Sequence, residues 1–315
     1  MKWRRKRGRK GRDVIDIRGA SPGPSSGTSG GGFGGMGGLP IPGGVAGLGG
    51  GAGVVVLIVV VAIQLIGGGG ATGFDFGAPA FGGGSQAPGA DNPAPIPPEE
   101  DPQVDLKDFS SYVFTDAQNT WSKIFGDDGD RYDRAELVLY SDAVSTGGCG
   151  SATSAVGPFY CPADSRVYLD LSFYEDMSRQ LGAPGDFAWA YVIAHELGHH
   201  VQNIKGTNDQ VADAERDDPD SANELSVRLE LQADCYAGVW AATVFAEGDL
   251  QRGDLDEAFT ATEAIGDDRL QREAGQSVDP DSFTHGTSEQ RRTWFENGYE
   301  GGDPAECDTF SPDSV

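Results

Sequence analysis

The sequence predicts a mainly helical α+β domain with a small β-sheet, spanning residues 105–310 of the 315-residue chain. Apolar runs with helical spacing occupy residues 187–203 and 221–245, which predicts two buried helices. Two shorter apolar runs, at 135–140 and 166–171, read as strands, the second because apolar and polar residues alternate along it. About 200 residues are enough for one domain with its own core.

A basic head at residues 1–18 precedes this domain. It holds nine lysines and arginines and two aspartates, a net charge of +7, whereas the whole chain carries −26. The strongly acidic remainder argues against nucleic acid as a partner. A basic segment followed by an apolar run is typical of the cytoplasmic end of a membrane protein.

An uncharged apolar segment lies at residues 45–70, with Val54–Ile66 at its centre. A helix of that central stretch covers only about 20 Å, so the glycine-rich flanks must complete a span of about 30 Å. We expect one transmembrane anchor in the cell membrane, with the N-terminus cytoplasmic and the domain outside. A cleaved signal peptide and a buried core helix are the alternatives.

The segments on either side of this anchor are predicted to be disordered linkers. Residues 19–44 are rich in glycine, and residues 71–104 are rich in glycine, proline and alanine. Neither has enough large apolar side chains to build a core. The folded part is therefore expected to begin near residue 105.

Three further helices and a helix start can be placed inside the domain. A helix over 106–125 is expected because apolar residues recur there at helical spacing. Shorter helices are expected at 173–181 and 255–265. A last helix should start near Thr287, where Gln290 completes a capping-box pattern. We expect four tryptophans to lie in the core: Trp121, Trp189, Trp240 and Trp294.

Four cysteines, all beyond the apolar segment, predict two disulfides in an exported domain. The sequence alone allows three pairings. We expect Cys149–Cys161 to close a local loop and Cys235–Cys307 to tie the C-terminus to the second long helix. In the alternative, Cys235 is a metal ligand. It lies about 100° round the helix from Asp234, however, and on a different face from Glu230.

Residues 195–199 read His-Glu-Leu-Gly-His, an H-E-x-x-H pattern on an apolar helical background. His195 and His199 are four residues apart, share a helix face and can bind one zinc ion. Glu196 then lies beside the metal, where a carboxylate can take a proton from bound water. The alternative is an ordinary pair of surface histidines.

Two neighbouring residues have simpler expected roles. Asp186 follows Pro184 and Gly185 and stands where the N-cap of this helix is expected. His200 is rotated by about 100° from His199, so we expect a partly exposed or packing residue rather than a metal ligand.

A catalytic zinc site needs a third protein ligand and an open position. Glu230, on the second long helix, is the predicted ligand, and Glu224 is the fallback. Asp234 shares a face with Glu230 and is expected to accept a hydrogen bond from a ligand histidine. A solvated acidic face is the alternative, but the apolar neighbours predict enclosed carboxylates, which need a cation or donors.

These motifs resemble those of the bacterial neutral zinc metallopeptidases that carry one membrane anchor. The resemblance is carried by H-E-L-G-H-H-V-Q and E-L-Q-A-D-C-Y-A-G-V-W, with further matches at 1–4, 157–164, 167–171 and 284–291. It covers about residues 105–310 and the first 20 residues. It implies a zincin-like domain.

The E-x-x-A-D pattern is also similar to that of the M48-type membrane peptidases. That resemblance implies that Glu230 binds zinc and that Asp234 supports a ligand. The Thr-His-Pro segment of those enzymes resembles Thr284-His285-Gly286, which implies that His285 acts on the transition state. Gly286 departs from the pattern.

Together these features predict a membrane-anchored zinc metallopeptidase of the H-E-x-x-H type that cleaves peptides or proteins. One zinc per chain is held by His195, His199 and Glu230, with Glu196 as general base and His285 as a donor to the oxyanion. The alternative is a non-catalytic, membrane-tethered zinc-binding module. A structural zinc site has no use for Glu196, so its presence favours catalysis.

Overall fold

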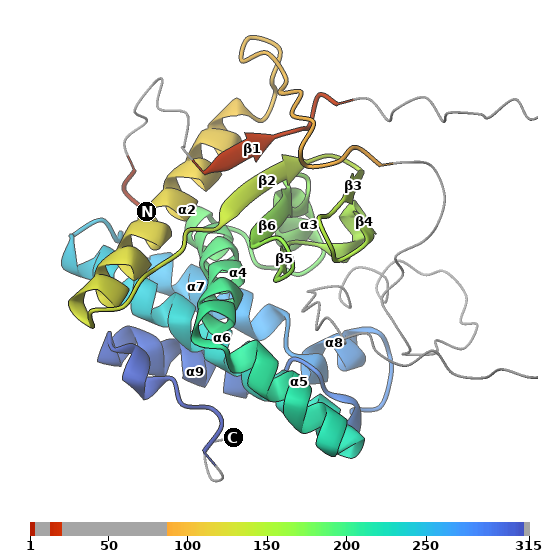
Figure 1. Ribbon diagram of the computed structural model, residues 1–315, viewed down its shortest axis with the longest axis vertical. Helices are drawn as coiled ribbons and strands as arrows, with labels where there is room; N and C mark the ends of the chain where they lie inside the picture. Colours follow the sequence, from red (N-terminus) through yellow and green to blue (C-terminus); the bar gives the residue numbers. More distant parts are fainter. Residues whose placement is uncertain (4–12, 21–86, 312–315) are drawn as a thin grey trace, which may run out of the picture.

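The computed structural model describes residues 1–3, 13–20 and 87–311. Over these ranges the chain is mainly helical with a small mixed sheet, so the predicted α+β, zincin-like class is confirmed (Figure 1). The predicted anchor at 45–70 and most of both predicted linkers fall outside the described residues. Within the described ranges, no helix combines the length and the apolar character that a membrane span requires.

The main sheet has four strands in the order β1-β2-β6-β5. β1 and β6 both run parallel to β2, and β5 runs antiparallel to β6. The two central strands confirm the predicted ones to within a residue, and both are almost wholly buried. A separate hairpin pairs β3 with β4. The bounds are β1 (Val14–Asp16), β2 (Glu136–Tyr140), β3 (Ala143–Ser145), β4 (Ser151–Thr153), β5 (Phe159–Cys161) and β6 (Arg166–Asp170).

Six helices match the predicted ones, with ends that differ by a few residues at most. They are α2 (Val104–Asp127), α3 (Phe173–Arg179), α4 (Asp186–Lys205), α6 (Ala222–Ala246), α7 (Asp254–Ala264) and α9 (Ser288–Gly301). Two helices were not predicted, α5 (Thr207–Asp217) and α8 (Asp267–Glu273). In Figure 1, α4 passes between the sheet on one side and α6, α7 and α9 on the other.

The helix starts test two of the predicted caps. The capping box of α9 is present as predicted, with Thr287 and Gln290 bonding each other's backbone. The predicted N-cap of α4 is wrong by one residue, because Gly185 occupies the cap position and Asp186 is the first helical residue. The Asp186 carboxylate instead lies 2.8 Å from the α-ammonium group of Met1.

The packed region is wider than the predicted range of 105–310. Residues 13–20 of the chain lie against the sheet, and Ile17 is buried. Residues 87–103, predicted to be disordered, also pack, because Asp101 is buried against Arg18 and the Ala94 carbonyl accepts a bond from the backbone of Gly19. Polar contacts of this kind leave no apolar pattern in the sequence.

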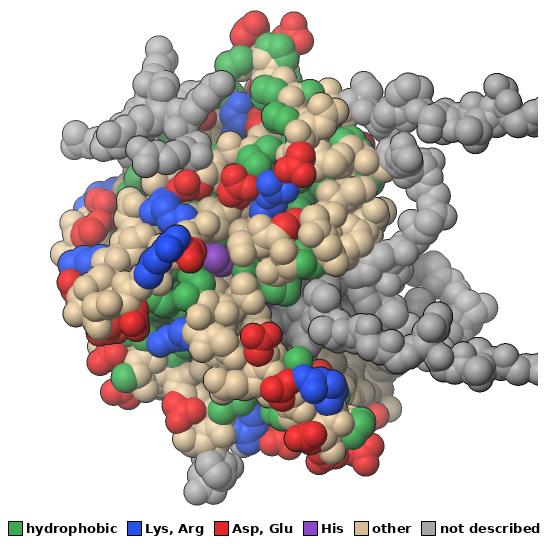
Figure 2. Space-filling view, viewed as in Figure 1, with side chains coloured by type: hydrophobic (Ala, Val, Ile, Leu, Met, Phe, Trp, Pro, Cys, Tyr) green, Lys and Arg blue, Asp and Glu red, His purple; other side chains and the backbone are tan. Residues whose placement is uncertain are grey.

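The interior and the covalent cross-links agree with the sequence. Both predicted disulfides are present, Cys149–Cys161 and Cys235–Cys307. All four tryptophans expected in the core are buried. Acidic and basic side chains share the face shown in Figure 2, where histidine contributes only a small area. All four histidines are buried, so the candidate site lies inside the domain.

Candidate metal centre

The site lies where α4 and α6 cross closely. Gly198, inside the H-E-x-x-H pattern, faces Ala233 of α6, and a Cβ atom placed on Gly198 would lie 3.0 Å from the Ala233 carbonyl oxygen. This is tighter than ordinary side-chain contact, so glycine allows the two backbones to approach. This close approach brings the Glu230 carboxylate of α6 to the imidazoles of His195 and His199 on α4.

His195, His199 and Glu230 come together as predicted. Their ligand atoms all lie within 4.8 Å of one another, and all three side chains are buried. The Nε2 atom of His195 is 3.2 Å from Glu230 Oε2, and His199 Nε2 is 3.6 Å from Glu230 Oε1. Among the described residues, neither His195 Nε2 nor Glu230 Oε2 has a hydrogen-bond partner of accepted geometry, and both are buried. Two imidazole nitrogens and a carboxylate are a donor set that suits zinc.

Asp234 fixes the orientation of His195. Its Oδ1 atom lies 2.8 Å from His195 Nδ1, so that nitrogen donates and Nε2 is left for a metal. Arg291, fully buried, donates to both carboxylate oxygens of Asp234 at 2.8 and 3.0 Å, and the Tyr191 hydroxyl donates to Oδ1. The buried carboxylate is thereby compensated by a buried cation.

A separate contact fixes the orientation of His199. Its Nδ1 atom lies 2.8 Å from the Gln202 side-chain oxygen, and the Gln202 amide nitrogen donates to the Leu229 carbonyl of α6 at 2.7 Å. His199 therefore also leaves its Nε2 atom available for a metal ion. The glutamine links its ring to the helix that carries Glu230.

The charges of the three candidate ligands are coupled. Burial alone lowers the pKa of His195, but the charge of Asp234 and the hydrogen bond to it raise that pKa to about 9. Burial lowers the pKa of His199 to about 4. Although burial opposes ionisation of Glu230, the two imidazoles hold its pKa below the usual range. A metal ion at this site would replace the proton on His195, so binding should release a proton.

Glu196 lies beside the ligands without joining them. Burial raises the pKa of its carboxyl group to about 8, and the charge of His195 opposes this only partly. One carboxylate oxygen, Oε2, is buried with no hydrogen-bond partner, and the backbone of Tyr160 on β5 bonds the group. An unpartnered buried oxygen is costly to a fold. Once the group is ionised, this oxygen can accept a proton from a molecule that enters the site.

His285 is brought to the same region, as predicted, but its partner Asp267 was not foreseen. Asp267 accepts hydrogen bonds from the backbone nitrogens of Thr284, His285 and Gly286 at 2.7, 2.6 and 3.2 Å. Its other oxygen lies 3.2 Å from His285 Nδ1. Burial opposes protonation of His285, but the bond to Asp267 and the charge of Glu230 raise its pKa to about 9. His285 is therefore a cationic donor close enough to Glu230 for the two charges to act on each other.

The structure excludes three alternatives to the predicted ligand set. Glu224 is an exposed residue that pairs with Arg228, so it is not a ligand. Cys235 is bonded to Cys307, which excludes it as a ligand. Glu230 and Asp234 are buried, so the solvated acidic face is wrong. His200 packs as predicted, with its ring nitrogens near the Tyr160 hydroxyl and the Asp133 carbonyl.

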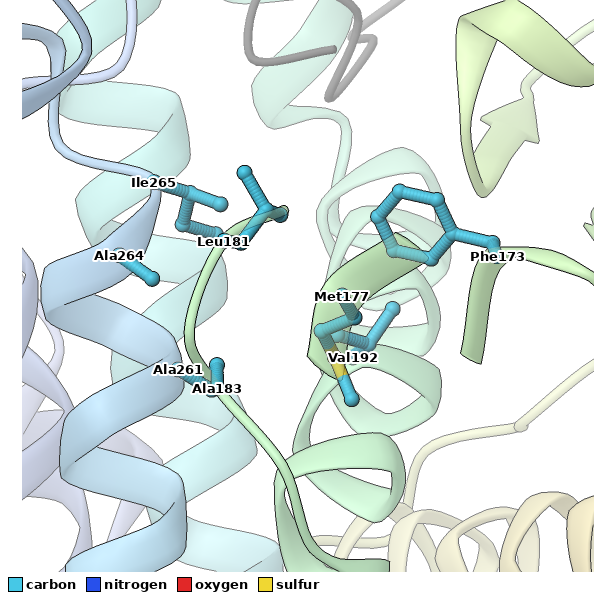
Figure 3. Close-up of a pocket in the computed structure, with 8 residues that line it drawn as sticks. All are labelled: Phe173, Met177, Leu181, Ala183, Val192, Ala261, Ala264 and Ile265. Carbon is cyan, nitrogen blue, oxygen red and sulfur yellow. The ribbon is translucent and has the colours of Figure 1, made fainter. Parts of the chain in front are cut away.

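A small apolar pocket lies beside α4, between α3 and α7 (Figure 3). Val192 forms part of its wall, one helical turn before Glu196. The eight lining side chains include no titratable group, so the pocket adds no chemistry to the centre. They are Phe173, Met177, Leu181, Ala183, Val192, Ala261, Ala264 and Ile265.

Comparison with known proteins gives an independent assignment. The family model described as "Putative neutral zinc metallopeptidase" matches residues 1–310. The chain is 50% identical over 216 residues to the uncharacterized protein YpfJ of Escherichia coli K12, covering 68% of this chain and 74% of that protein.

A more distant relative comes from another bacterial group. The chain is 45% identical over 191 residues to the uncharacterized protein Mb2605 of Mycobacterium bovis, covering 57% of this chain and 64% of that protein. No solved structure matches the chain significantly. Because the family model spans nearly the whole sequence, the chain belongs to the neutral zinc metallopeptidase family described above.

Proposed function

We propose that this protein hydrolyses peptide bonds with one zinc ion held by His195, His199 and Glu230. The main support is Glu196, whose buried oxygen Oε2 has no hydrogen-bond partner and adjoins a candidate ligand. A structural metal site has no need of such a group. The three converging ligand atoms supply the rest of the support.

The chain's own residues account for the proton transfers of such a reaction. Zinc, when bound, would acidify a water molecule and polarise the substrate carbonyl. Glu196 accepts a proton from the attacking water at Oε2 and delivers it to the nitrogen of the leaving amine, so it ends the cycle as a carboxylate. His285 donates a hydrogen bond to the carbonyl oxygen as negative charge develops there, while Asp267 holds its Nδ1 atom.

Replacement of one residue tests the proposal. Glu196→Gln keeps the shape of the side chain but cannot accept the proton. We expect the variant to keep its zinc, measured by elemental analysis, while hydrolysis of casein or a peptide falls by roughly 10²- to 10⁴-fold. A variant with full activity would contradict the role of Glu196. A wild-type chain that binds zinc but cleaves nothing would favour the non-catalytic module instead.

We also propose that the enzyme works at the membrane, held by the apolar segment 45–70, in an oxidising compartment. The two disulfides support that compartment, since disulfides persist in exported proteins and are rare in the cytosol. Peptide or protein chains that reach this compartment would be its substrates.

A further inference from the structure

Part of the basic head is a strand of the main sheet. β1 pairs with β2 in parallel, with Val14 opposite Leu137, Ile15 opposite Val138 and Asp16 opposite Leu139. The backbone ladder continues beyond the strand, because the Leu137 amide donates to Asp13 at 2.7 Å and the Ile17 amide donates to Leu139 at 2.8 Å. The head is therefore joined to the core strand of the domain by main-chain bonds.

A buried ion network fixes the end of this strand. Arg18 donates to Asp16 at 2.8 Å and to Asp101 at 2.6 Å, and the side chains of Arg18 and Asp101 have no exposed surface. Burial works against ionisation of Asp101, but the bond from Arg18 lowers the pKa of Asp101 to about 2. Removing the head would leave this buried carboxylate with the Lys107 ammonium, 3.0 Å away, as its remaining cationic partner among the described residues, beside the Gln103 backbone N–H at 2.9 Å.

The first residues of the head make a second, separate contact with the domain. The Trp3 ring lies 5.3 Å from the ring of Phe109 and 6.2 Å from that of Tyr112, both on α2. The Lys2 side chain donates to the Gly248 carbonyl at 2.9 Å. In Figure 1 the red segments lie beside α2 and β2. Two stretches of the head thus bind two different places on one body.

We propose that the basic head and the zinc-site domain lie on the same side of the membrane, with the head built into the domain's sheet. A strand bonded to β2 cannot lie across a hydrocarbon layer of about 30 Å. This revises the expectation of a segment at 45–70 that crosses the membrane once, with the head cytoplasmic and the domain external. Residues 20 and 87, which flank the apolar segment, then face the same compartment.

The charge distribution favours this arrangement. The head carries +7 and the rest of the chain −33, so the two attract each other wherever they share a compartment. Arg18, one of the nine basic residues of the head, is bound between two carboxylates, and one of them, Asp101, lies beyond the apolar segment.

Cross-linking in intact membranes tests the proposal. Ile15→Cys and Val138→Cys are register partners on strands about 4.8 Å apart, within reach of a disulfide. A protease site is also inserted between residues 21 and 86. Cleavage at this site releases the head from the domain unless a disulfide links the two. After oxidation of sealed vesicles with copper–phenanthroline and proteolysis in detergent, we expect the head to stay attached on a non-reducing gel.

The matched control pairs Ile15→Cys with Leu139→Cys, whose side chain points to the opposite face of the sheet. This pair should link far less. If the Ile15–Val138 pair links in detergent but not in sealed vesicles, the head and domain lie on opposite sides and the proposal is wrong. If it links in neither, the strand pairing itself is absent, which also overturns the proposal.

A melting experiment provides a second measurement that needs neither zinc nor activity. In the detergent-solubilised full chain, Arg18→Ala should lower the melting temperature by several degrees, because it leaves Asp101 buried without its guanidinium partner. The control is Arg131→Ala, since the Arg131 side chain is 85% exposed and pairs with the exposed Asp133. Equal melting of Arg18→Ala and the wild type would show that the head is not part of the fold.

Discussion

At the scale of single residues, Asp267 organises more of the site than its place in the sequence indicates. One of its oxygens accepts three consecutive backbone N–H groups, and the other holds the imidazole of His285. A neutral amide of the same shape cannot reproduce this set of acceptors. The carboxylate therefore fixes both the loop and the charge of the histidine that it carries.

Asp267→Asn should shift the pH dependence of the reaction. The bond to Asp267 helps to raise the pKa of His285 to about 9, so without that charge the pKa falls. While Nδ1 keeps the proton that faces residue 267, Nε2 can donate only in the protonated ring, and the ring would then lose its charge at lower pH. We expect the alkaline limit of kcat/KM to move to lower pH while zinc content is unchanged. An unmoved limit would assign that limit to another group.

His285→Ala should remove the donor itself. We expect kcat to fall by roughly 10²-fold, the usual scale for one oxyanion donor, with zinc retained. Zinc content and single-turnover rates measure the two effects separately. Loss of zinc from this variant would make His285 a ligand, and full activity would make it a loop residue without a catalytic role.

Glu230→Ala should weaken zinc retention by at least tenfold, because it removes one of three candidate ligands. Glu224→Ala is the matched control, since that carboxylate lies on the same helix but is exposed and paired with Arg228. Competition with a chelator measures both variants. Similar retention in the two variants would show that Glu230 is not a ligand.

The three candidate metal ligands could be picked out from the sequence, whereas most of the residues that hold them in place could not. His195, His199 and Glu230 follow from one-turn spacing and a known ligand chemistry. Asp234 shares a helix face with Glu230, so it was also found. Arg291, Tyr191, Gln202 and Asp267 act through tertiary contacts that no local spacing encodes. For Arg291 the only signal was its place at the end of a motif shared with the family.

At the scale of secondary-structure elements, the crossing of α4 and α6 sets the width of the metal site. Gly198→Ala gains helix propensity but places a Cβ atom 3.0 Å from the Ala233 carbonyl oxygen. We expect the clash to outweigh the gain in helix propensity, so that both the melting temperature and the zinc affinity fall. Gly126→Ala is the control, because Gly126 lies in α2 with nothing within 4 Å of the added Cβ.

The control variant should be neutral or stabilised by up to about 1 kcal/mol, the helix preference of alanine over glycine. If Gly198→Ala behaves in the same way, the two helices can separate at no cost and the close crossing does not control the site. Calorimetry together with zinc titration distinguishes these outcomes.

Long elements could be predicted from periodicity, and short ones could not. α4 and α6 each present many apolar positions, and their ends fell within a few residues of the prediction. Strands of three residues, such as β1 and β5, cannot display an alternation. α5 was missed because it is polar along most of its length, with Val211 its one buried residue.

At the scale of the whole molecule, the two disulfides restrain very different lengths of chain. Cys149–Cys161 spans 12 residues and Cys235–Cys307 spans 72. The chain-entropy relation gives about 3 kcal/mol for the shorter loop and about 4 kcal/mol for the longer one. The second bond also holds the C-terminal segment against α6, which carries Glu230.

Replacing Cys235 and Cys307 together by alanine should therefore destabilise the domain by about 4 kcal/mol, and replacing the other pair by about 3 kcal/mol. Denaturant unfolding of both double variants measures the difference. The Cys235/Cys307 variant should also bind zinc less tightly. A larger loss from the shorter loop would indicate that strain or packing, rather than chain length, decides the contribution.

The pairing of β1 with β2 also has a consequence for how the protein is made. Ile15 and Val138 are partners 123 residues apart, so the ribosome finishes the first strand long before the second. At 5–20 residues per second, this delay is about 6 to 25 s. β1 must therefore stay unpaired in the nascent chain for that time, whereas β2 finds its partner strand already made.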